Sequence, residues 1–435
     1  MKPEHRELTA KAISIIVVVF GVASLLLFFY QSIQNFFRFE EIDFSSYVRA
    51  SGWFFDGENP YQDVIRRFIY PQFLLIVVYP LTFLQKNQWL SGISIGLWSA
   101  GLYASFFATL GAAWKYLYGY HSWREALGKN LLPVGLVILM LHPFLQSEFL
   151  NGQVNLFVLG ATAGFFFMLV RGKTLGAALM LAIAVSIKIS PAVCLLYILF
   201  SRQFRVAGYF LILIVLFNMV IPYLINTESL NYYAYVVDEI LPKVTGSDFH
   251  HGFRQFSILS TISYLFKIHW NPLVKVAVLC ILAIGLVLPI ATNAPRRYRV
   301  TSPFHKFAIF GALVAIVPLI FPMSEPHHLL LQTIPFLVIL AYWKRVIDGG
   351  RRFRRDGLSL LFLISVLGYH VGHGLKDTPI HIFSLLGVYI GMLWLLRYLA
   401  GESRESIENN IKSSLVCDSP PHRPPANPWK KPPGD

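Results

Sequence analysis

Residues 11–30, KAISIIVVVFGVASLLLFFY, contain a single charged side chain and are apolar along almost their whole length. A helix of twenty residues is about 30 Å long, which matches the hydrocarbon core of a lipid bilayer. The segment therefore predicts a transmembrane helix. No small-residue cleavage site follows it, so we expect the helix to be retained rather than removed as a signal peptide.

Eleven further apolar runs follow along the chain. Hydrophobic residues make up 55% of the sequence and charged residues only 14%, which is far from the composition of soluble domains. We therefore predict an all-α polytopic membrane protein with about twelve transmembrane helices. The further runs are residues 69–84, 90–114, 131–146, 153–170, 174–200, 206–225, 273–292, 304–321, 328–343, 358–371 and 380–399.

Basic residues indicate how the chain threads through the membrane. Lys and Arg number 37 against 23 Asp and Glu, and they gather in short loops such as residues 344–355 and near the start, at Arg6 and Lys11. Under the positive-inside rule both chain ends lie in the cytoplasm, and the long loops 31–68 and 226–271 face outward. The net charge of +14 thus reflects basic residues gathered in the cytoplasmic loops of a plasma (inner) membrane protein. It does not indicate a nucleic-acid patch, and we expect no nucleic-acid partner.

The domain organisation follows from these segments. Residues 1–400 are predicted to form one transmembrane domain, with short interfacial helices in its two long loops. Residues 401–435 are rich in proline and cannot bury a core, so we predict a disordered cytoplasmic tail. The three cysteines are far apart in the sequence and form no metal-binding or disulfide spacing, so we expect neither a cofactor nor a metal site.

One of the predicted helices has two interpretations. Residues 174–200 are interrupted by Lys188 and Pro191, so they form either one helix or two half-helices. In the second case Arg171 and Arg202 would both be cytoplasmic, and the segment around residues 150–155 would change sides.

The first long loop is rich in aromatic and polar side chains. Its pattern suits a short helix at the membrane interface, with Asp43 and Arg49 turned toward water or a cavity. Asp43 also has a simpler interpretation, as the N-cap of a helix that begins at Phe44. The candidate substrate-binding residues here are Tyr47, Arg49, Asn59, Tyr61 and Tyr70.

A second group of polar residues interrupts apolar runs. Asn151, Gln153 and Asn155 form a dense amide cluster, which is either a ligand site or a helix–helix turn capped by its own side chains. Lys188 beside Pro191 suggests an anion site, because a cation in an apolar run must pair or extend to the membrane surface.

A third group lies in the second long loop and beyond it. Arg254 and Gln255 are candidate binding residues in the loop, and His327 and His328 precede an apolar run. Adjacent residues on a helix do not share a face, so the two histidines are not a metal pair. Each could contact a sugar or phosphate, or could be an amphipathic residue at the membrane interface.

Taken in order, these motifs resemble bacterial glycosyltransferase family 87, of the C-type superfamily that uses polyprenol-phosphate sugars. The chain departs from the family where it has Tyr70-Pro71-Gln72 instead of Tyr-Pro-Pro, and Arg254-Gln255-Phe256-Ser257 instead of Asn-Gln-Ser. The resemblance rests on Asp43-Phe44, Tyr47, residues 57–61, Tyr70-Pro71, the Asn-Gly-Gln-Val-Asn stretch at 151–155, and Lys188 with Pro191.

The resemblance implies a C-type glycosyltransferase fold and a membrane hexosyltransferase. The donor would be a polyprenyl-phosphate sugar, with mannose favoured, and the acceptor a lipid or glycan hydroxyl at the extracytoplasmic (periplasmic) face. Asp43 matches the family's catalytic base, which takes the acceptor proton while the anomeric carbon is attacked with inversion. A cation would stabilise the departing phosphate, and the candidates are Lys188, Arg254 and His327 or His328. The sequence contains no nucleotide-phosphate loop and no Asp-x-Asp metal motif, so we predict metal-independent transfer.

Two other functions fit many apolar helices. A transporter or flippase for a lipid-linked glycan would also use a broken helix and cations facing a cavity, but it predicts an internal repeat, and none is visible. An O-antigen ligase or an acyltransferase is the other alternative. In the acyltransferase His251 would be the base, with Asp248 three residues before it.

Overall fold

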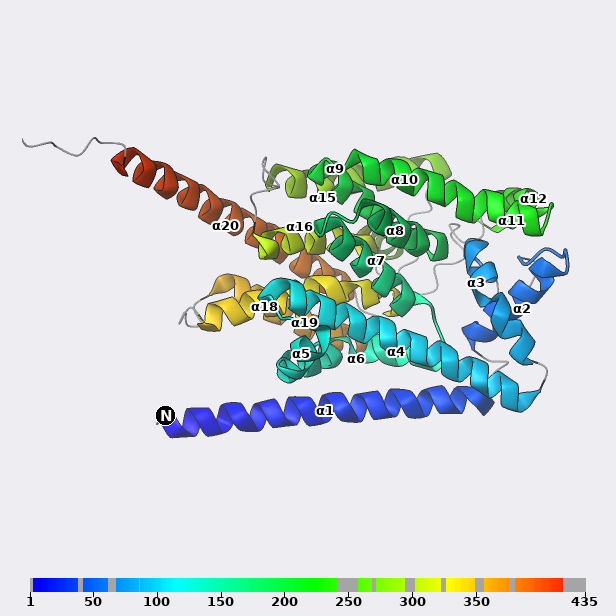
Figure 1. Ribbon diagram of the computed structural model, residues 1–435, viewed down its shortest axis with the longest axis horizontal. Helices are drawn as coiled ribbons and strands as arrows, with labels where there is room; N and C mark the ends of the chain where they lie inside the picture. Colours follow the sequence, from blue (N-terminus) through cyan, green and yellow to red (C-terminus); the bar gives the residue numbers. More distant parts are fainter. Residues whose placement is uncertain are drawn as a thin grey trace, which may run out of the picture.

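The computed structural model is built from helices, and no strand occurs among the residues that it describes. Those residues are 3–37, 42–61, 68–85, 87–240, 257–267, 271–293, 302–321, 326–348, 356–374 and 380–417. Most of the long helices run roughly along one common direction, and the N-terminus of α1 lies at the end of the molecule opposite to α2, α11 and α12 (Figure 1).

The helices match the predicted apolar runs, and shorter helices occupy the loops. In chain order they are α1 (Pro3–Phe37), α2 (Asp43–Phe55), α3 (Phe73–Thr82), η2 (Phe83–Gln85), α4 (Gln88–Tyr118), α5 (Trp123–Gly128), α6 (Leu131–Asn151), α7 (Asn155–Val170), α8 (Thr174–Ile187), η3 (Ser190–Cys194), α9 (Leu195–Ser201), α10 (Phe204–Val215), η4 (Leu216–Val220), α11 (Ile221–Ile225), α12 (Ser229–Tyr235), η5 (Val236–Ile240), α14 (Ile258–Phe266), α15 (Pro272–Asn293), α16 (Pro303–Ala315), α17 (Val317–Ile320), η8 (Pro326–Gln332), α18 (Thr333–Asp348), α19 (Gly357–Gly374) and α20 (Ile380–Cys417).

Eight segments of the described chain are long and apolar enough to cross a membrane, which establishes a multi-pass membrane protein. Their burial differs widely: 83% of the Pro303–Ile320 window and 78% of the Leu329–Ile347 window are buried, but only 11% of the Phe204–Ile225 and Val274–Asn293 windows. An apolar helix that the protein leaves uncovered needs lipid around it. The α16 and α18 segments therefore form the centre of the bundle, and the α10–α11 and α15 segments face the hydrocarbon.

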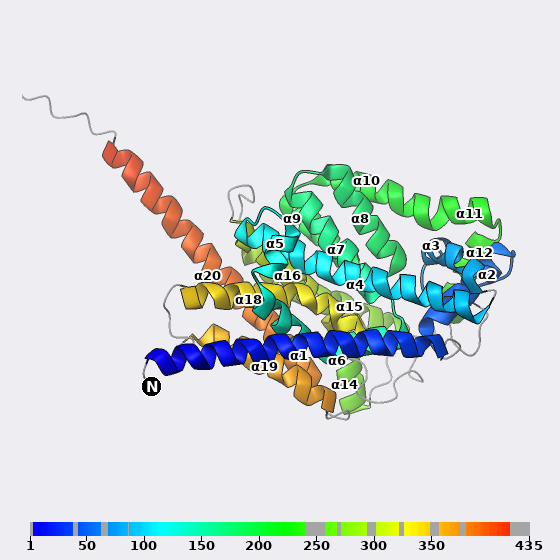
Figure 2. The same ribbon diagram turned by 60° about the horizontal axis from the view of Figure 1, so that its bottom comes forward.

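The predicted count of twelve crossings is not confirmed, because four of the predicted runs, 69–84, 153–170, 174–200 and 358–371, are not among these eight segments. Two of the four runs have a clear structural reason. The run at 69–84 forms α3 and η2, a short pair that lies across the end of the bundle beside α2 (Figures 1 and 2). The run at 174–200 is broken, because Lys188 has extended backbone angles after α8 and a 3₁₀ turn follows. An apolar run in a sequence does not distinguish a crossing helix from one that lies across the bundle or turns back.

The break decides between the two interpretations of this run. From Asn155, α7 runs away from the Asn151–Asn155 turn, and α8 returns along it until the Lys188 ammonium lies 2.8 Å from the Asn155 amide oxygen. The segment α10–α11 then leads from residue 204 to Asn226, which donates to a carbonyl of α2 at 2.9 Å. Arg171 and Arg202 therefore both lie at the end of the bundle opposite to α2, as two half-helices predict.

The two long loops meet at one end of the molecule. Asn226 donates to the Phe54 carbonyl at 2.9 Å, and the Tyr232 hydroxyl donates to the Gly57 carbonyl at 2.9 Å. The Gln72 amide donates to the Ser229 carbonyl at 2.8 Å. Three side chains thus join the first loop region to the second through main-chain oxygens, and this arrangement positions the elements around Asp43.

Small residues allow α1 to pack closely on α6. A Cβ atom at Gly21 would lie 3.2 Å from the Gly135 Cα, and one at Gly135 would lie 3.0 Å from Val17. Close backbone approach through glycine is a common way to pack helices within a bilayer. His142 of α6 adds a contact of 3.1 Å between its Nδ1 and the Ser24 hydroxyl of α1.

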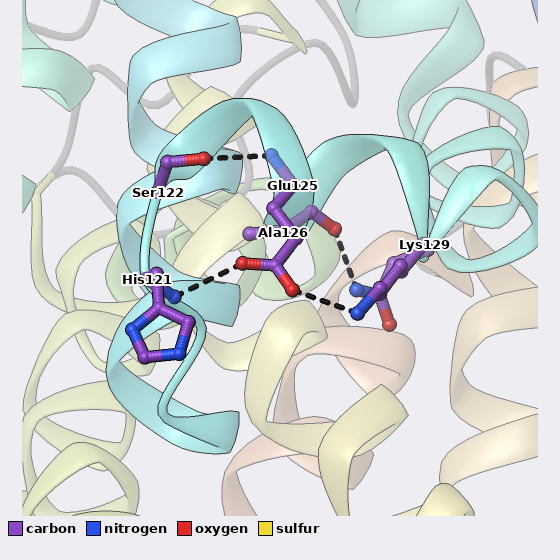
Figure 3. A network of polar contacts seen from close by, with 6 residues as sticks. His121, Ser122, Glu125, Ala126 and Lys129 are labelled. Atoms are coloured by element: carbon purple, nitrogen blue, oxygen red, sulfur yellow. Dashed lines mark hydrogen bonds and ion pairs between the residues drawn. The ribbon is translucent and has the colours of Figure 1, made fainter.

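The short helix α5 lies toward the end of the bundle opposite to α2 (Figure 1). Its N-terminus is capped by side chains, and it carries a salt bridge (Figure 3). The Ser122 hydroxyl accepts from the Glu125 N–H at 3.1 Å, and the Glu125 carboxylate accepts from the His121 N–H at 3.1 Å, which forms a variant of the capping box. Lys129 donates to Glu125 at 2.7 Å, and this hydrogen bond lowers the pKa of the carboxyl. Because folding lowers this pKa, the pair stabilises the folded state at pH values above the usual pKa range of a carboxyl group. That stabilisation is lost as the pH falls through the lowered pKa.

The C-terminal segment differs from the predicted disordered tail. Helix α20 continues through Cys417, so residues 401–417 are helical rather than disordered. It projects beyond the other helices (Figures 1 and 2). The proline-rich residues 418–435 lie outside the described residues.

The arrangement predicts opposite exposure for two surface positions. Glu58 follows α2, and Lys173 lies between α7 and α8 at the other end of the bundle; both side chains are exposed. With the native cysteines replaced, we expect Glu58→Cys to react with a membrane-impermeant maleimide in spheroplasts, whereas Lys173→Cys reacts only after permeabilisation. Labelling of both variants from the same side would contradict this topology.

Candidate functional site

The candidate site is built around the tight turn between α6 and α7. Gly152 ends α6 with a φ of 62°, and its N–H donates to the Glu148 carbonyl. A Cβ at this position would lie 2.9 Å from the Phe44 Cβ, so the turn and the start of α2 approach more closely than a side chain allows. The indole N–H of Trp98 donates to the Gly152 carbonyl at 3.0 Å and fixes the turn from α4.

Gln153 connects this turn to the predicted base. Its side-chain NH₂ donates to the Asp43 carboxylate in a short hydrogen bond. Its carbonyl oxygen lies 3.1 Å from the Tyr47 hydroxyl and 3.2 Å from the Tyr70 hydroxyl. A carboxylate oxygen only accepts, so the Gln153 NH₂ must face Asp43, and the Gln153 carbonyl oxygen then accepts from the two tyrosine hydroxyls.

Asp43 is the first residue of α2, and the N-cap is Ile42, so the alternative assignment of Asp43 as the N-cap is wrong. A carboxylate in the first turn is stabilised by the positive end of the helix dipole. Burial, followed by the neighbouring Tyr70 and Asp43, raises the pKa of the Tyr47 hydroxyl well above its usual value. Tyr47 therefore stays protonated and can donate throughout the working pH range.

On the other side of the turn, Asn155 connects to a cation and a buried acid. The Lys188 ammonium donates to the Asn155 amide oxygen at 2.8 Å and lies 6.0 Å from the centre of the Tyr70 ring. The Asn155 NH₂ donates to the Glu148 carboxylate at 2.9 Å, and the other Glu148 oxygen accepts from the Leu156 N–H at 2.9 Å. The turn thus presents a carboxylate through Gln153 and an ammonium through Asn155.

Other predicted site residues have local roles in the structure. The Asn59 side chain accepts from the Tyr61 N–H at 3.0 Å, and the Tyr61 hydroxyl donates to the Tyr70 carbonyl at 3.1 Å, so both shape the first loop. Asn151 donates back to the Ser147 carbonyl of its own helix at 2.9 Å. Arg49 lies on α2, two residues after Tyr47.

The remaining predicted residues are described only in part. Arg254 and Gln255 lie outside the described residues, as do Asp248 and His251 of the acyltransferase alternative. The backbones of His327 and His328 belong to η8, which packs against α6 and α7, the two helices that flank the turn. Their side chains are outside the described part of the chain.

Sequence reasoning missed Glu148, which is 0% exposed and central to the Asn155 network. The predicted apolar run ended at residue 146, whereas α6 continues to Asn151 and places Glu148 in its last turns. The available signal was an acidic residue, Glu148, directly after an apolar run and seven positions before Asn155. An ionisable residue at the end of a membrane helix is often functional. Trp98 was missed as well, because its role is a bond to a main-chain carbonyl.

Comparison with known protein families gives the same assignment as the motifs. The model of glycosyltransferase family 87 matches residues 68–322, which is more than half of the chain. The protein is a membrane glycosyltransferase of family 87. The match includes Tyr70, Gln153, Asn155 and Lys188 but begins after Asp43. No curated protein matches the chain.

The turn at Gly152 provides a test of how tightly the site is constrained. Gly152→Ala adds a methyl group against Phe44 and places alanine in the left-handed region, which costs about 1–3 kcal/mol. We expect a lower Tm and reduced transfer. Gly208→Ala in α10 is the control, because no atom lies within 4 Å of the added Cβ; its Tm should be unchanged or slightly higher. Equal Tm and activity in the two variants would contradict the close approach.

Proposed function

We propose that the protein transfers a hexose, with mannose favoured, from a polyprenyl-phosphate donor to a hydroxyl of a lipid or glycan acceptor, with inversion, on the extracytoplasmic side. The proposal rests on one observation: a carboxylate and an ammonium both contact the Asn151–Asn155 turn, through Gln153 and Asn155 respectively. Membership of a glycosyltransferase family favours this reaction over a flippase.

In the proposed reaction Asp43 is the general base. The acceptor oxygen attacks the anomeric carbon as the bond to the donor phosphate breaks, and the acceptor proton passes to the Asp43 carboxylate. Gln153 orients the carboxylate, and the Tyr47 and Tyr70 hydroxyls hold the Gln153 amide.

Lys188 is the proposed cation for the leaving phosphate. The phosphate gains negative charge as its bond to the sugar breaks, so an ammonium stabilises the transition state more than the ground state. Lys188 follows the last turn of α8, and its backbone is extended rather than helical. This assignment needs no bound metal. Arg254 and the histidines at 327 and 328 remain candidates for further phosphate or sugar contacts.

The uncovered helices support a lipid-linked donor. Only 11% of the apolar window in Phe204–Ile225 is buried, and this segment ends at Asn226 beside α2. Phe217 within it stacks on Phe73 of α3 at 4.6 Å between ring centroids. A polyprenyl chain could therefore remain in the bilayer along this face while its phosphate reaches the polar end of the bundle.

Replacement of the base tests the mechanism directly. In Asp43→Asn the side chain can still accept from Gln153, but it cannot take up a proton, so we expect transfer to fall by about 10²–10⁴-fold. The assay gives membranes a radiolabelled polyprenyl-phosphate hexose and a lipid extract. Asp56→Asn is the control, since Asp56 is exposed at the other end of α2. Undiminished transfer by Asp43→Asn would refute the assignment; transport without a covalent product would refute the enzyme.

The cation is tested in the same assay. Lys188→Met retains most of the side-chain length but removes the charge, so we expect kcat to fall by at least about tenfold through lost stabilisation of the phosphate. Lys173→Met, at the exposed opposite end of α8, should transfer at the normal rate. A Lys188→Met enzyme with normal kcat would assign the leaving-group role to another residue.

A further inference from the structure

Glu148 is a buried acid that has no role in the proposed reaction of Asp43 and Lys188. It lies in the apolar helix α6, is 0% exposed, and uses both carboxylate oxygens as acceptors. A buried charge is costly unless it is paired and hydrogen bonded. Its partners are Asn155, which also contacts Lys188, and the Leu156 N–H in the first turn of α7.

The bond between Glu148 and Asn155 determines which way the Asn155 amide points. A carboxylate oxygen only accepts, so the Asn155 NH₂ must face Glu148. The amide oxygen then faces the opposite way, where it accepts from the Lys188 ammonium at 2.8 Å. If the amide were reversed, its NH₂ would face the ammonium and neither group could accept. Because Glu148 accepts from the NH₂ of Asn155, the amide oxygen of Asn155 is left to accept from Lys188.

Glu148 also completes the N-terminus of α7. The N-cap residue is Val154, which has no side-chain acceptor, and the Glu148 carboxylate accepts from the Leu156 N–H instead. This contact alone would be a structural role. A test must therefore preserve the bond to Leu156 and change only the match at Asn155.

We propose that Glu148 is a positioning residue for sugar transfer: by fixing the Asn155 amide, it holds the Lys188 ammonium in place for the donor phosphate. This inference rests on the proposed function of Lys188. The arrangement also places a negative charge on one side of the amide and a positive charge on the other. The buried acid therefore compensates the charge of the cation electrostatically, while only the cation contacts the phosphate.

The experiment is a double-mutant cycle that reverses the hydrogen-bond polarity. Glu148→Gln retains an oxygen for Leu156 but turns an NH₂ toward Asn155, which must flip and lose Lys188. Asn155→Asp alone places two carboxylates face to face. The double variant, Glu148→Gln with Asn155→Asp, restores the pattern, because the new carboxylate at 155 accepts from the new amide at 148 and from Lys188.

We expect each single variant to lower kcat for transfer at least about tenfold, with the donor KM changed less than about threefold and with Tm close to that of the wild type for Glu148→Gln. The double variant should recover to within about threefold of the wild-type kcat. A merely structural acid would give no such recovery. A double variant as slow as the slower single variant would overturn the inference.

A second measurement does not depend on turnover. In purified protein, modification of Lys188 by acetic anhydride is quantified by mass spectrometry. We expect it to be several-fold faster in Glu148→Gln and to return to the wild-type rate in the double variant. If Lys188→Met transfers normally but this labelling pattern holds, the phosphate role fails and the positioning role stands. Unchanged labelling across the cycle overturns the positioning role itself.

Discussion

The fixed orientation of two amide side chains is the constraint on which the polar site depends. Gln153 and Asn155 lie one residue apart in a turn that glycine makes possible, and each amide is held by a partner of unambiguous polarity. The Asp43 carboxylate determines the first, and the Glu148 carboxylate determines the second. The apolar bundle positions the ends of α6 and α7, whereas these few hydrogen bonds determine which amide atoms face Asp43 and Lys188.

Much of the helical architecture could be predicted from the sequence, because runs of apolar residues in a bilayer can satisfy their backbone only as helices. The break at Lys188 was also visible, since a charged residue and a proline interrupt an apolar run. The number of crossings was not predictable in the same way. Whether α3 crosses the bilayer depends on its contacts with α2 and the second loop, and hydropathy contains no information about those contacts.

The site could be predicted only in part for a related reason. Asp43, Gln153, Asn155 and Lys188 were singled out because polar residues are conspicuous beside apolar runs, and the structure brings them to one turn. Their pairing depends on rotamers and on helix ends. Glu148 fell in a stretch that was assigned to a loop, although α6 continues past it. The roles of Arg254, Gln255, His327 and His328 stay predictions.

The bonds that join the two long loops all end on main-chain carbonyls: Asn226 on Phe54, Tyr232 on Gly57, and Gln72 on Ser229. Every residue type supplies a carbonyl oxygen, so replacing Phe54, Gly57 or Ser229 leaves the acceptor itself in place. Other constraints still act on these three positions, because Phe54 and Ser229 are fully buried and Gly57 has a φ of 84°. The junction between the two loop regions is therefore defined by the path of the backbone and by the donor groups of Gln72, Asn226 and Tyr232.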